Sequence, residues 1–400
     1  MNTNSLRIGI ASTGRFHMFD LARQLAALGQ KPRLFTGYPR FKVDADLRPI
    51  CRTRSRWVLL EQAHRRLPTA LPPWVRVRMF QDFGRWLDRT LAAADLDVLD
   101  ALEGSGLEAG RRVRDAGGIW VCNRGSSHLL TQKRLLEEEY RRWGFPLPRH
   151  FFPPEYVDRC LAEYVGADAI AVGSSFSRET FVRQGLPAAK VHVCPYGVDL
   201  SLFRPAAKRD DRFRVLFAGT QSLRKGIGYL FDALRPLVKK GAVELWLAGH
   251  VQPESRALLD RNADIFVHQG VLARAELSWY YSQASVLVLP SIEEGLALVQ
   301  AQAMACGVPV IATRNTGAED LFTDGVEGLI VPARSPGAIR DAIQWMLDNP
   351  DERERMAAAG LERVTQLGGW DAYGRRCLEV YRAVLGEKRG ARETQLLRAS

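Results

Sequence analysis

Two carboxylates and one pair of adjacent cations are the residues of this sequence whose types and spacing could do chemistry. Glu293 and Glu294 follow a strand-like run and precede an Ala-rich helical run. Arg224 and Lys225 end a loop that begins at Gly219 and opens directly into another helical run. Cations at a helix N-terminus oppose the helix dipole, and the backbone N–H groups there also favour an anion. The loop therefore predicts a diphosphate site, and the Glu294 carboxylate could accept a hydrogen bond from a sugar hydroxyl.

The position of both pairs at the carboxyl end of a strand-like run favours a binding role. Taken alone, an Arg-Lys pair in a turn or two acids in a loop are usually solvated surface groups. In open α/β sheets, however, ligands bind beyond the carboxyl ends of the strands. We therefore interpret both pairs as candidate ligand contacts and examine the other loops that follow strands.

The loop after the first strand-like run is a third candidate, with Gly14, Arg15 and His17. Gly9 and Gly14 have the spacing of a phosphate-binding P-loop, but Arg15-Phe16 stands where that motif requires Lys and Ser or Thr. No Gly-x-Gly-x-x-Gly fingerprint occurs here either. Two interpretations stay open, a tight turn into a helix or a loop that contacts substrate.

The cysteines, histidines and apolar runs exclude several other classes of site. The six cysteines lie far apart with no Cys-x-x-Cys pair, and no histidine lies within four residues of another. This spacing indicates free thiols in a reducing compartment and no zinc site. No apolar run reaches the ~20 residues of a membrane-spanning helix, and the start at Met1 lacks the apolar core of a secretory signal. We expect a cytosolic protein with no metal site.

The positive charge of the chain is concentrated in residues 33–89. This stretch holds thirteen Lys and Arg against five acids, so it carries +8 of the net charge of +11. It also holds eight aromatic residues, namely Phe35, Tyr38, Phe41, Trp57, Trp74, Phe80, Phe83 and Trp86. Interleaved basic and aromatic residues are typical of the interface of an anionic membrane. The alternative is an ordinary helical face whose aromatic residues belong to the core. Nucleic acid is not expected, because no recognition module appears.

Short apolar runs alternate with helix-period segments along the whole chain. The predicted strands are Arg7–Ser12, Arg33–Thr36, Asp97–Leu102, Gly118–Asn123, Ala169–Ser174, Val191–Tyr196, Phe213–Ala218, Val243–Ala248, Asp264–His268, Ser285–Leu289, Val308–Ala312 and Gly328–Val331. The predicted helices are Met18–Leu28, Leu130–Trp143, Gly226–Lys239, Ala275–Ala284, Leu296–Cys306, Pro336–Leu347 and Trp370–Leu385. Continuous Val/Ile/Leu strands alternating with helices predict parallel sheets covered on both faces.

The length of 400 residues predicts two such α/β domains, because single cores stop growing near ~250–300 residues. We place the boundary in the polar stretch after Pro195, giving an N-terminal domain over 1–205 and a C-terminal domain over 206–369. Residues 370–400 are expected to form a separate helix, which could pack back on the N-terminal domain, and a polar tail that frays from Glu387.

Three segments together resemble family 4 of the retaining glycosyltransferases, also called glycosyl transferases group 1. They are Leu289–Thr313, the loop Gly219–Gly226 and Pro195–Pro205. Over residues 191–350 the sequence motifs themselves match the family. Over residues 1–190 the segments match by their position in the chain more than by motif. The resemblance implies the GT-B fold, two Rossmann-like doubly wound domains that face each other across a cleft. It also implies transfer of a sugar from a nucleoside diphosphate sugar to an acceptor hydroxyl, with retention and without a metal or other cofactor. The acceptor is expected to be a lipid-linked or cell-surface glycan.

The resemblance assigns roles to individual residues. Glu294 matches the first acid of the family's motif of two Glu separated by seven residues, and would contact the donor sugar. Lys225, helped by Arg224, would hold the diphosphate. His128 follows a strand, as the family's active-site His does, although a lone His is more often structural. The other donor-side residues are Thr220, Val271, Gly295, Leu298 and Gln302, and the acceptor-side residues are Gly14, Arg15 and His17.

Three departures from the family pattern concern the donor. Gln302 stands where the family has its second Glu, Thr220 replaces an Arg, and Ala297 occupies a position that is commonly Gly. Two other classes stay open beside the transferase, a sugar-nucleotide epimerase or phosphorylase of the same fold, and a binding protein that has lost catalysis. The acidic helix motif at Glu294 argues against the former, and Gln302 would be the suspected lesion of the latter.

Overall fold

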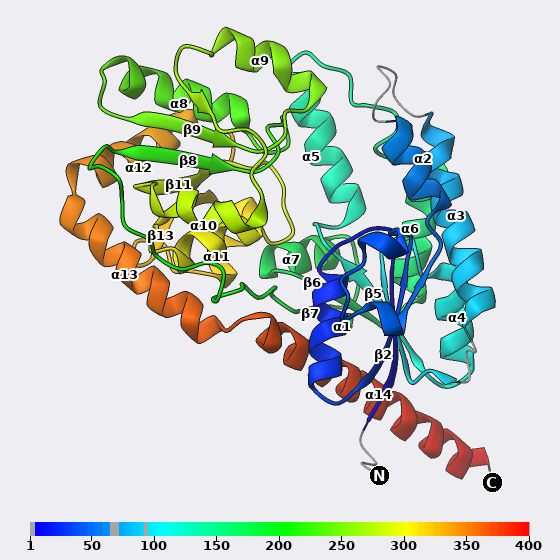
Figure 1. The fold of residues 1–400 in the computed structure, drawn as a ribbon. Coiled ribbons are helices and arrows are strands. Elements are labelled where there is room, and N and C mark those ends of the chain that lie inside the picture. Colours follow the sequence, from blue (N-terminus) through cyan, green and yellow to red (C-terminus); the bar gives the residue numbers. More distant parts are fainter. Residues whose placement is uncertain (1–4, 65–71, 92–94, 400) are drawn as a thin grey trace.

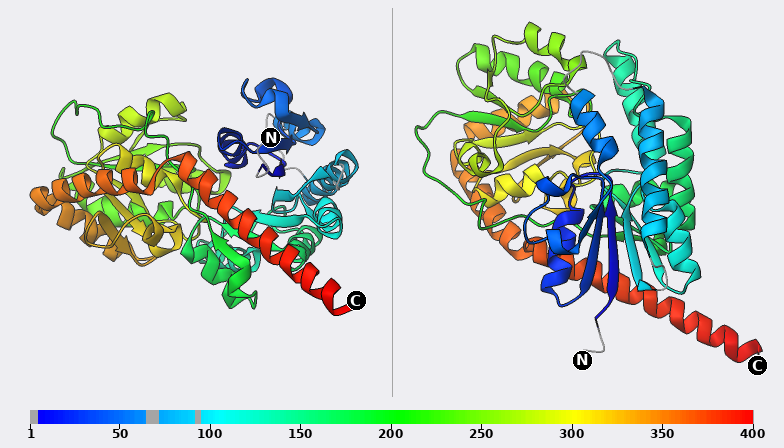
Figure 2. Two further views of the ribbon diagram at one scale, coloured as in Figure 1. Left: turned by 90° about the horizontal axis from the view of Figure 1, so that it is seen from below. Right: turned by 45° about the vertical axis from the view of Figure 1, so that its right-hand side comes forward.

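The computed structural model describes residues 5–64, 72–91 and 95–399, and its framework is a pair of parallel β-sheets (Figure 1). The described residues form a seven-stranded sheet of order β3-β2-β1-β4-β5-β6-β7 and a six-stranded sheet of order β10-β9-β8-β11-β12-β13. Helices cover the faces of both sheets (Figures 1 and 2). The predicted fold class, two doubly wound α/β units, is confirmed.

The first sheet and its helices form what we call the N-terminal half. Its strands are β1 (Arg7–Ser12), β2 (Lys31–Thr36), β3 (Cys51–Thr53), β4 (Val98–Leu102), β5 (Ile119–Arg124), β6 (Ala169–Val172) and β7 (Val191–Val193). Its helices are α1 (Met18–Ala27), α2 (Arg56–His64), α3 (Pro73–Thr90), α4 (Leu107–Asp115), α5 (Leu129–Arg142), α6 (Pro154–Gly166) and α7 (Ser175–Arg183). All six residues of β5 are buried, as expected of a parallel strand covered on both faces.

The second sheet and its helices form the C-terminal half. Its strands are β8 (Arg214–Ala218), β9 (Glu244–Ala248), β10 (Val267–His268), β11 (Val286–Leu289), β12 (Val310–Thr313) and β13 (Gly328–Val331). Its helices are α8 (Ile227–Lys239), α9 (Arg256–Arg261), α10 (Arg274–Ser282), α11 (Leu298–Ala305), α12 (Pro336–Asp348) and α13 (Pro350–Leu367). The start of α12 has Pro336 in its first turn and the Ser335 side chain accepting from Ala338 N, which is a standard N-cap.

The basic stretch 33–89 contains β3, α2 and α3, elements that the apolar pattern did not predict. Helix α3 buries Phe80 and Phe83 in the same core cluster as Phe35, so these three aromatic residues are core. Phe41 and Trp74, in contrast, are 68% and 59% exposed. The core interpretation therefore holds for part of the stretch only. Arg65 and Arg66 lie outside the described residues.

Helix α14 (Trp370–Ala399) leaves the C-terminal half and runs across the N-terminal half (Figures 1 and 2). Tyr373, Cys377 and Tyr381 are buried in one cluster with residues of β1 and α1. The expectation of a frayed tail from Glu387 is wrong, because the helix continues to Ala399. Lys388 Nζ holds this part of the helix by donating to Gly118 O at 2.8 Å.

A second set of contacts joins the two halves along α5. Arg334, which follows β13, donates to Glu139 Oε2 at 2.8 Å and to Glu138 Oε2 at 3.2 Å. The ring of Trp143, just after α5, packs edge-on against Tyr229 of α8 at 5.6 Å between centroids. These contacts place the loop before α5 against the C-terminal half.

Candidate active site

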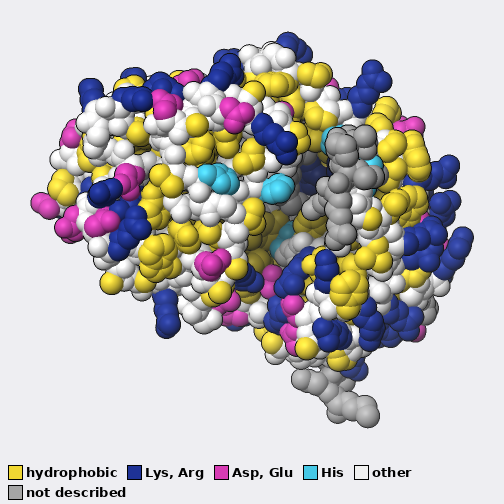
Figure 3. Space-filling view, turned by 45° about the horizontal axis from the view of Figure 1, so that its top comes forward, with side chains coloured by type: hydrophobic (Ala, Val, Ile, Leu, Met, Phe, Trp, Pro, Cys, Tyr) yellow, Lys and Arg dark blue, Asp and Glu magenta, His cyan; other side chains and the backbone are white. Residues whose placement is uncertain are grey.

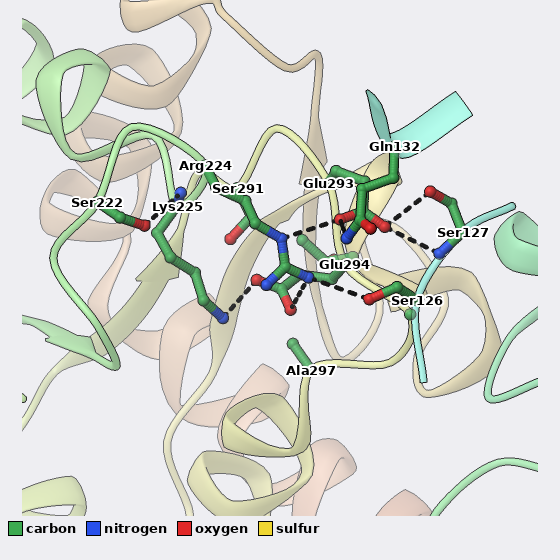
Figure 4. A network of polar contacts seen from close by, with 12 residues as sticks. Ser126, Ser127, Gln132, Ser222, Arg224, Lys225, Ser291, Glu293, Glu294 and Ala297 are labelled. Carbon is green, nitrogen blue, oxygen red and sulfur yellow. Dashed lines mark hydrogen bonds and ion pairs between the residues drawn. The ribbon is translucent and has the colours of Figure 1, made fainter. Parts of the chain in front are cut away.

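The predicted cations and carboxylates meet in one cluster at the carboxyl ends of β8 and β11, which are neighbours in the second sheet (Figure 4). Arg224 Nε lies 2.9 Å from Glu293 Oε2, and Arg224 Nη2 lies 3.3 Å from Glu294 Oε2. Lys225 Nζ forms an ion pair with Glu294 Oε1. Glu294 and Glu293 outweigh the effect of burial and raise the pKa of Arg224. The two cations are thus neutralised within the chain.

Gly226 brings this loop against the end of β11. Its φ of +70° lies in the left-handed region, and a Cβ there would lie 2.1 Å from Pro290 O. Both facts require glycine, because any other side chain would clash with the Pro290 backbone. The turn places Arg224 and Lys225 at the start of α8, opposite the two acids. A bound diphosphate is therefore not needed to offset their unfavourable position at a helix N-terminus.

Glu293 is fully buried and links the two halves of the molecule. Its Oε1 accepts hydrogen bonds from the backbone N and the Oγ of Ser127, at 2.8 and 2.7 Å. Its Oε2 accepts from Gln132 Nε2 at 2.9 Å, in addition to Arg224 Nε. Burial alone would raise the pKa of Glu293, but Arg224 and these hydrogen bonds outweigh it and lower the pKa to about 2.

At Gly295 the backbones of the two halves approach each other closely. A Cβ on Gly295 would lie 2.2 Å from Gly125 O in the loop after β5. The Ser174 hydroxyl, at the start of α7, donates to Gly295 O. The sequence predicted that Gly295 contacts the donor. The structure shows a steric role at the junction of the halves, where only glycine fits.

A cavity of about 410 Å³ lies between the halves, and its lining includes Leu298, the first residue of the helix that follows the Glu294 loop. Figure 3 shows a hollow at the junction of the halves with histidine side chains near it. From the N-terminal half the cavity is lined by Arg15 and His17, and from the C-terminal half by Leu298 and Gln302. Two of the predicted acceptor-side residues and two of the predicted donor-side residues thus line one cavity. Gly14 lines the adjoining cavity instead.

The Gln302 side chain is held by a buried tyrosine. Tyr281, fully buried on α10, donates its hydroxyl to Gln302 Oε1 at 2.9 Å. The amide oxygen of Gln302 is therefore engaged within the protein, and its NH₂ group can still donate hydrogen bonds. A Glu at this position would present an acceptor where Gln302 presents a donor.

His17 is a neutral histidine at the wall of the cavity. Its Nε2 lies 2.8 Å from Asn123 Oδ1, and its ring packs on Tyr196 at 4.4 Å between centroids. Burial lowers the pKa of His17 to about 4. Asn123 in turn donates to Asp100 Oδ2 at 3.4 Å, and Tyr381 of α14 donates to the same oxygen at 2.5 Å.

His128 lies away from the cavity, contrary to the role that the resemblance implies. Its ring is packed between Tyr164 and Phe181, with centroids at 4.9 Å in both cases, and the residue is 2% exposed. Its Nδ1 accepts from Leu130 N at 3.2 Å and so caps α5. Burial, with a smaller effect of Arg124, lowers the pKa of His128 to about 4. The geometry is that of a structural residue at the start of a helix.

The remaining predicted donor residues, Thr220 and Val271, do not line this cavity. Val271 is 71% exposed after β10, and Thr220 is half-buried in the loop after β8. Between them, His268 Nε2 lies 2.9 Å from Oε1 of the buried Gln221. This contact joins the end of β10 to the loop that carries Arg224 and Lys225.

Comparison with protein families decides the identity of both halves. The model of Glycosyltransferase Family 4 matches residues 15–202, and that of Glycosyl transferases group 1 matches residues 212–349. The chain belongs to glycosyltransferase family 4. The resemblance found in the sequence is confirmed, and the chain is a glycosyltransferase.

Curated relatives of this family 4 glycosyltransferase match it at low identity. The D-inositol 3-phosphate glycosyltransferase of Frankia alni is 28% identical over 92% of this chain and 94% of its own length. The enzyme of that name from Xylanimonas cellulosilytica is 31% identical over 57% of this chain, and the match spans 60% of that relative. The MMP alpha-(1->4)-mannosyltransferase of Mycolicibacterium hassiacum is 26% identical over 64% of this chain and 63% of its own length.

Solved structures show the fold of this glycosyltransferase. A sucrose-phosphate synthase from Thermosynechococcus elongatus aligns with a TM-score of 0.74 and 23% identity, over 96% of this chain and all of the other. The Anabaena protein HepE in complex with UDP and glucose aligns with a TM-score of 0.67 and 16% identity, over 94% of this chain and all of the other. The predicted GT-B arrangement is confirmed.

The sequence of this family 4 member does not reveal the partners of Glu293. Ser127 and Gln132 lie more than 160 positions earlier in the chain, so no local spacing connects them with Glu293. One signal was present, because Arg124 ends a strand in which every residue is buried. A buried Arg needs a carboxylate or another acceptor nearby.

Within the part of the chain that the structure describes, no group of His, Cys, Asp and Glu side chains could hold a metal ion. None of the helices formed by these residues is long and apolar enough to cross a membrane.

Proposed function

We propose that this glycosyltransferase moves a sugar from a nucleoside diphosphate sugar to an acceptor hydroxyl bound by the N-terminal half. The observation that carries the proposal is the ion pair of Lys225 with Glu294, which lies four positions before Leu298, a residue that lines the cavity together with His17 and Gln302. Lys225 supplies a cation for the diphosphate, and the adjacent Glu294 carboxylate can accept hydrogen bonds from sugar hydroxyls. The complex of HepE, a protein of the same fold, with UDP and glucose supports a donor of this class.

In this proposal, donor binding exchanges partners within the cluster. The diphosphate takes over Lys225, and Glu294, released from the ion pair, accepts hydrogen bonds from the sugar. Arg224 stays bound to Glu293 and presents its free N–H groups to the phosphates. Cations already in place stabilise the charge that develops on the leaving diphosphate, by several kcal/mol per well-placed group. We propose that the transfer retains the anomeric configuration and needs no metal.

The acceptor is proposed to bind in the cavity of about 780 Å³ next to Gly14 and Arg15. Apolar side chains such as Trp57 and Met79 line it together with Arg76, whose guanidinium lies 4.5 Å from the centre of the Tyr156 ring. An acceptor with an apolar part and an anionic group fits this lining, which supports a lipid-linked glycan. Curated relatives are named for D-inositol 3-phosphate, a phosphorylated acceptor.

We also propose that the surface of residues 33–89 contacts the inner face of an anionic membrane. Exposed apolar side chains on and around α2 and α3 (Phe41, Leu59, Leu60 and Trp74) accompany the exposed Lys and Arg of this stretch. Such a surface can bury its apolar groups at a membrane interface while its cations pair with acidic lipids. Lys and Arg side chains gather on the right-hand side of the molecule in Figure 3.

A thermal-shift panel with UDP, GDP, ADP and dTDP tests the donor site. A ligand at 100 times its dissociation constant adds ~2.7 kcal/mol to stability. We expect one nucleotide to raise the melting temperature of the wild type and to have no such effect on Lys225→Ala. Lys240→Ala, at the other end of α8, is the matched control and should respond as the wild type does. Equal responses of the two variants would refute the assignment of Lys225, and no response of the wild type would refute the donor site.

A further inference from the structure

A continuous chain of alternating charges runs from the core of the N-terminal half to the proposed phosphate site. Its members, in order, are Glu103, Arg124, Gln132, Glu293, Arg224, Glu294 and Lys225. Gln132 is the neutral link at the crossing between the halves. Its Oε1 accepts from Arg124 Nη2 at 2.8 Å. Its Nε2 donates to Glu293 Oε2 at 2.9 Å (Figure 4).

Burial makes each link of this chain depend on the next. Glu103, Arg124 and Glu293 are 4%, 7% and 0% exposed, so water cannot replace a partner that is lost. A buried charge without a partner is strongly unfavourable. The Gln132 amide satisfies one charge on each side of the boundary between the halves. It therefore transmits any shift of α5 to Glu293.

The partners of Glu293 are divided unequally between the halves. Three of its four hydrogen bonds come from the N-terminal half, two from Ser127 and one from Gln132. The fourth comes from Arg224, which also contacts Glu294 and the Ser126 hydroxyl at 3.4 Å. If the N-terminal half moves away, Glu293 keeps Arg224 alone, and its carboxylate is free to turn. The direction of the Arg224 guanidinium then changes with it.

We propose that Gln132 and Glu293 are positioning residues that set Arg224 and Lys225 for the donor diphosphate only when the N-terminal half is docked. This inference rests on the proposed function, since it assumes that these cations bind the donor phosphates. Its consequence is that tight donor binding and closure of the acceptor side occur together. Coupling of this kind keeps the donor from being held in reactive geometry in an open, wet cleft.

The contacts of Arg334 provide a matched comparison. This residue also bonds across the boundary, to Glu138, Glu139 and Leu135 O on the same α5 helix. Neither it nor its partners contact Arg224 or Lys225. If Gln132 only holds the two halves together, its substitution and that of Arg334 should affect nucleotide binding equally. If Gln132 positions Arg224, its substitution should weaken nucleotide binding more than that of Arg334.

The experiment measures the affinity of the full chain for UDP, GDP, ADP and dTDP by titration calorimetry, with Gln132→Leu and Arg334→Leu in parallel. We expect Gln132→Leu to weaken the binding of the nucleotide that the wild type takes by about tenfold, the scale of one hydrogen bond to a charged group. Arg334→Leu should change it less than about threefold. Both variants should also be combined with Arg224→Gln. Because Gln132 acts through Arg224, Gln132→Leu should have little further effect in that background.

Ser127→Ala replaces Gln132→Leu if the latter does not fold, since it removes one hydroxyl donor to Glu293 and leaves the backbone donor in place. Its expected effect is about threefold. Equal weakening by Gln132→Leu and Arg334→Leu, or additive effects with Arg224→Gln, would overturn the inference. The inference would also be overturned, and the proposed function kept, if Lys225→Ala abolished nucleotide binding while Gln132→Leu and Ser127→Ala left that binding unchanged. If the wild type bound no nucleotide, the proposed function would fail first and the inference with it.

Discussion

Replacement of Asp100 by Asn tests the buried side chains that lead from α14 to His17. Asp100 lies on β4 and is fully buried, and its Oδ2 accepts hydrogen bonds from Tyr381 and Asn123. Its Oδ1 is buried with no hydrogen-bond partner among the described residues. Burial raises the pKa of Asp100 from 3.8 to about 7, and the two hydrogen bonds offset only part of the rise.

The sign of the effect follows from the proton balance. The folded protein keeps a proton on Asp100 between pH 3.8 and pH 7, whereas the unfolded chain loses it, so stability falls as the pH rises through this window. A rise of about 3 pKa units corresponds to roughly 4 kcal/mol above pH 7. The Asp100→Asn variant has no proton to lose. We expect its free energy of unfolding, relative to the wild type, to improve by about 3 kcal/mol between pH 5 and pH 8.

Urea unfolding of both proteins at pH 5 and pH 8 measures this difference directly. Any change in hydrogen bonding caused by Asp100→Asn is independent of pH and cancels in the comparison. Tyr381→Phe is the control, because it removes a hydrogen bond but keeps the carboxylate, and its stability should fall with pH at least as steeply as that of the wild type. If the wild type and Asp100→Asn show the same pH dependence, a buried Asp100 with a raised pKa is refuted.

Two further predictions concern the junction of the halves and the basic surface. Gly295→Ala should reduce transferase activity by about tenfold or more, because its Cβ would lie 2.2 Å from Gly125 O and force the halves apart. Gly386→Ala, whose Cβ would meet nothing within 4 Å, is the control, and an active Gly295→Ala enzyme would contradict the steric argument. The protein should float with acidic vesicles at low salt and not with neutral ones, and a negative charge introduced at Leu59 (Leu59→Asp) should weaken that binding. Equal flotation with both kinds of vesicle would exclude the proposed membrane contact.

The fold could be predicted from sequence because parallel strands buried on both faces leave continuous apolar runs. β8 and β11 lie inside the predicted strands, and their loops carry Arg224, Lys225 and Glu294 to one place because the two strands are neighbours in the sheet. The start of α11 was predicted two residues early. Ala297 has an extended backbone and donates to Thr316 O, so the helix begins only at Leu298.

The parts that could not be predicted depend on how the two halves meet. The partners of Glu293 come from the other half, and no periodicity in either half encodes their contact. His128 shows the same limit within one half. Its place after a strand is compatible with a residue in the cleft, but the ring turns into the core between Tyr164 and Phe181. That direction is decided by tertiary packing and leaves no local pattern.

The path of α14 has a consequence for the order in which the protein can be made. Its buried face, with Tyr373 and Tyr381, completes the core of β1 and α1, yet it is synthesised more than 340 residues after α1 ends at Ala27. At ~5–20 residues per second, translation takes about 20 to 70 s to cover that distance. During this time the apolar surface of the first half has no cover from its own chain. The nascent protein should therefore depend on a chaperone until α14 leaves the ribosome.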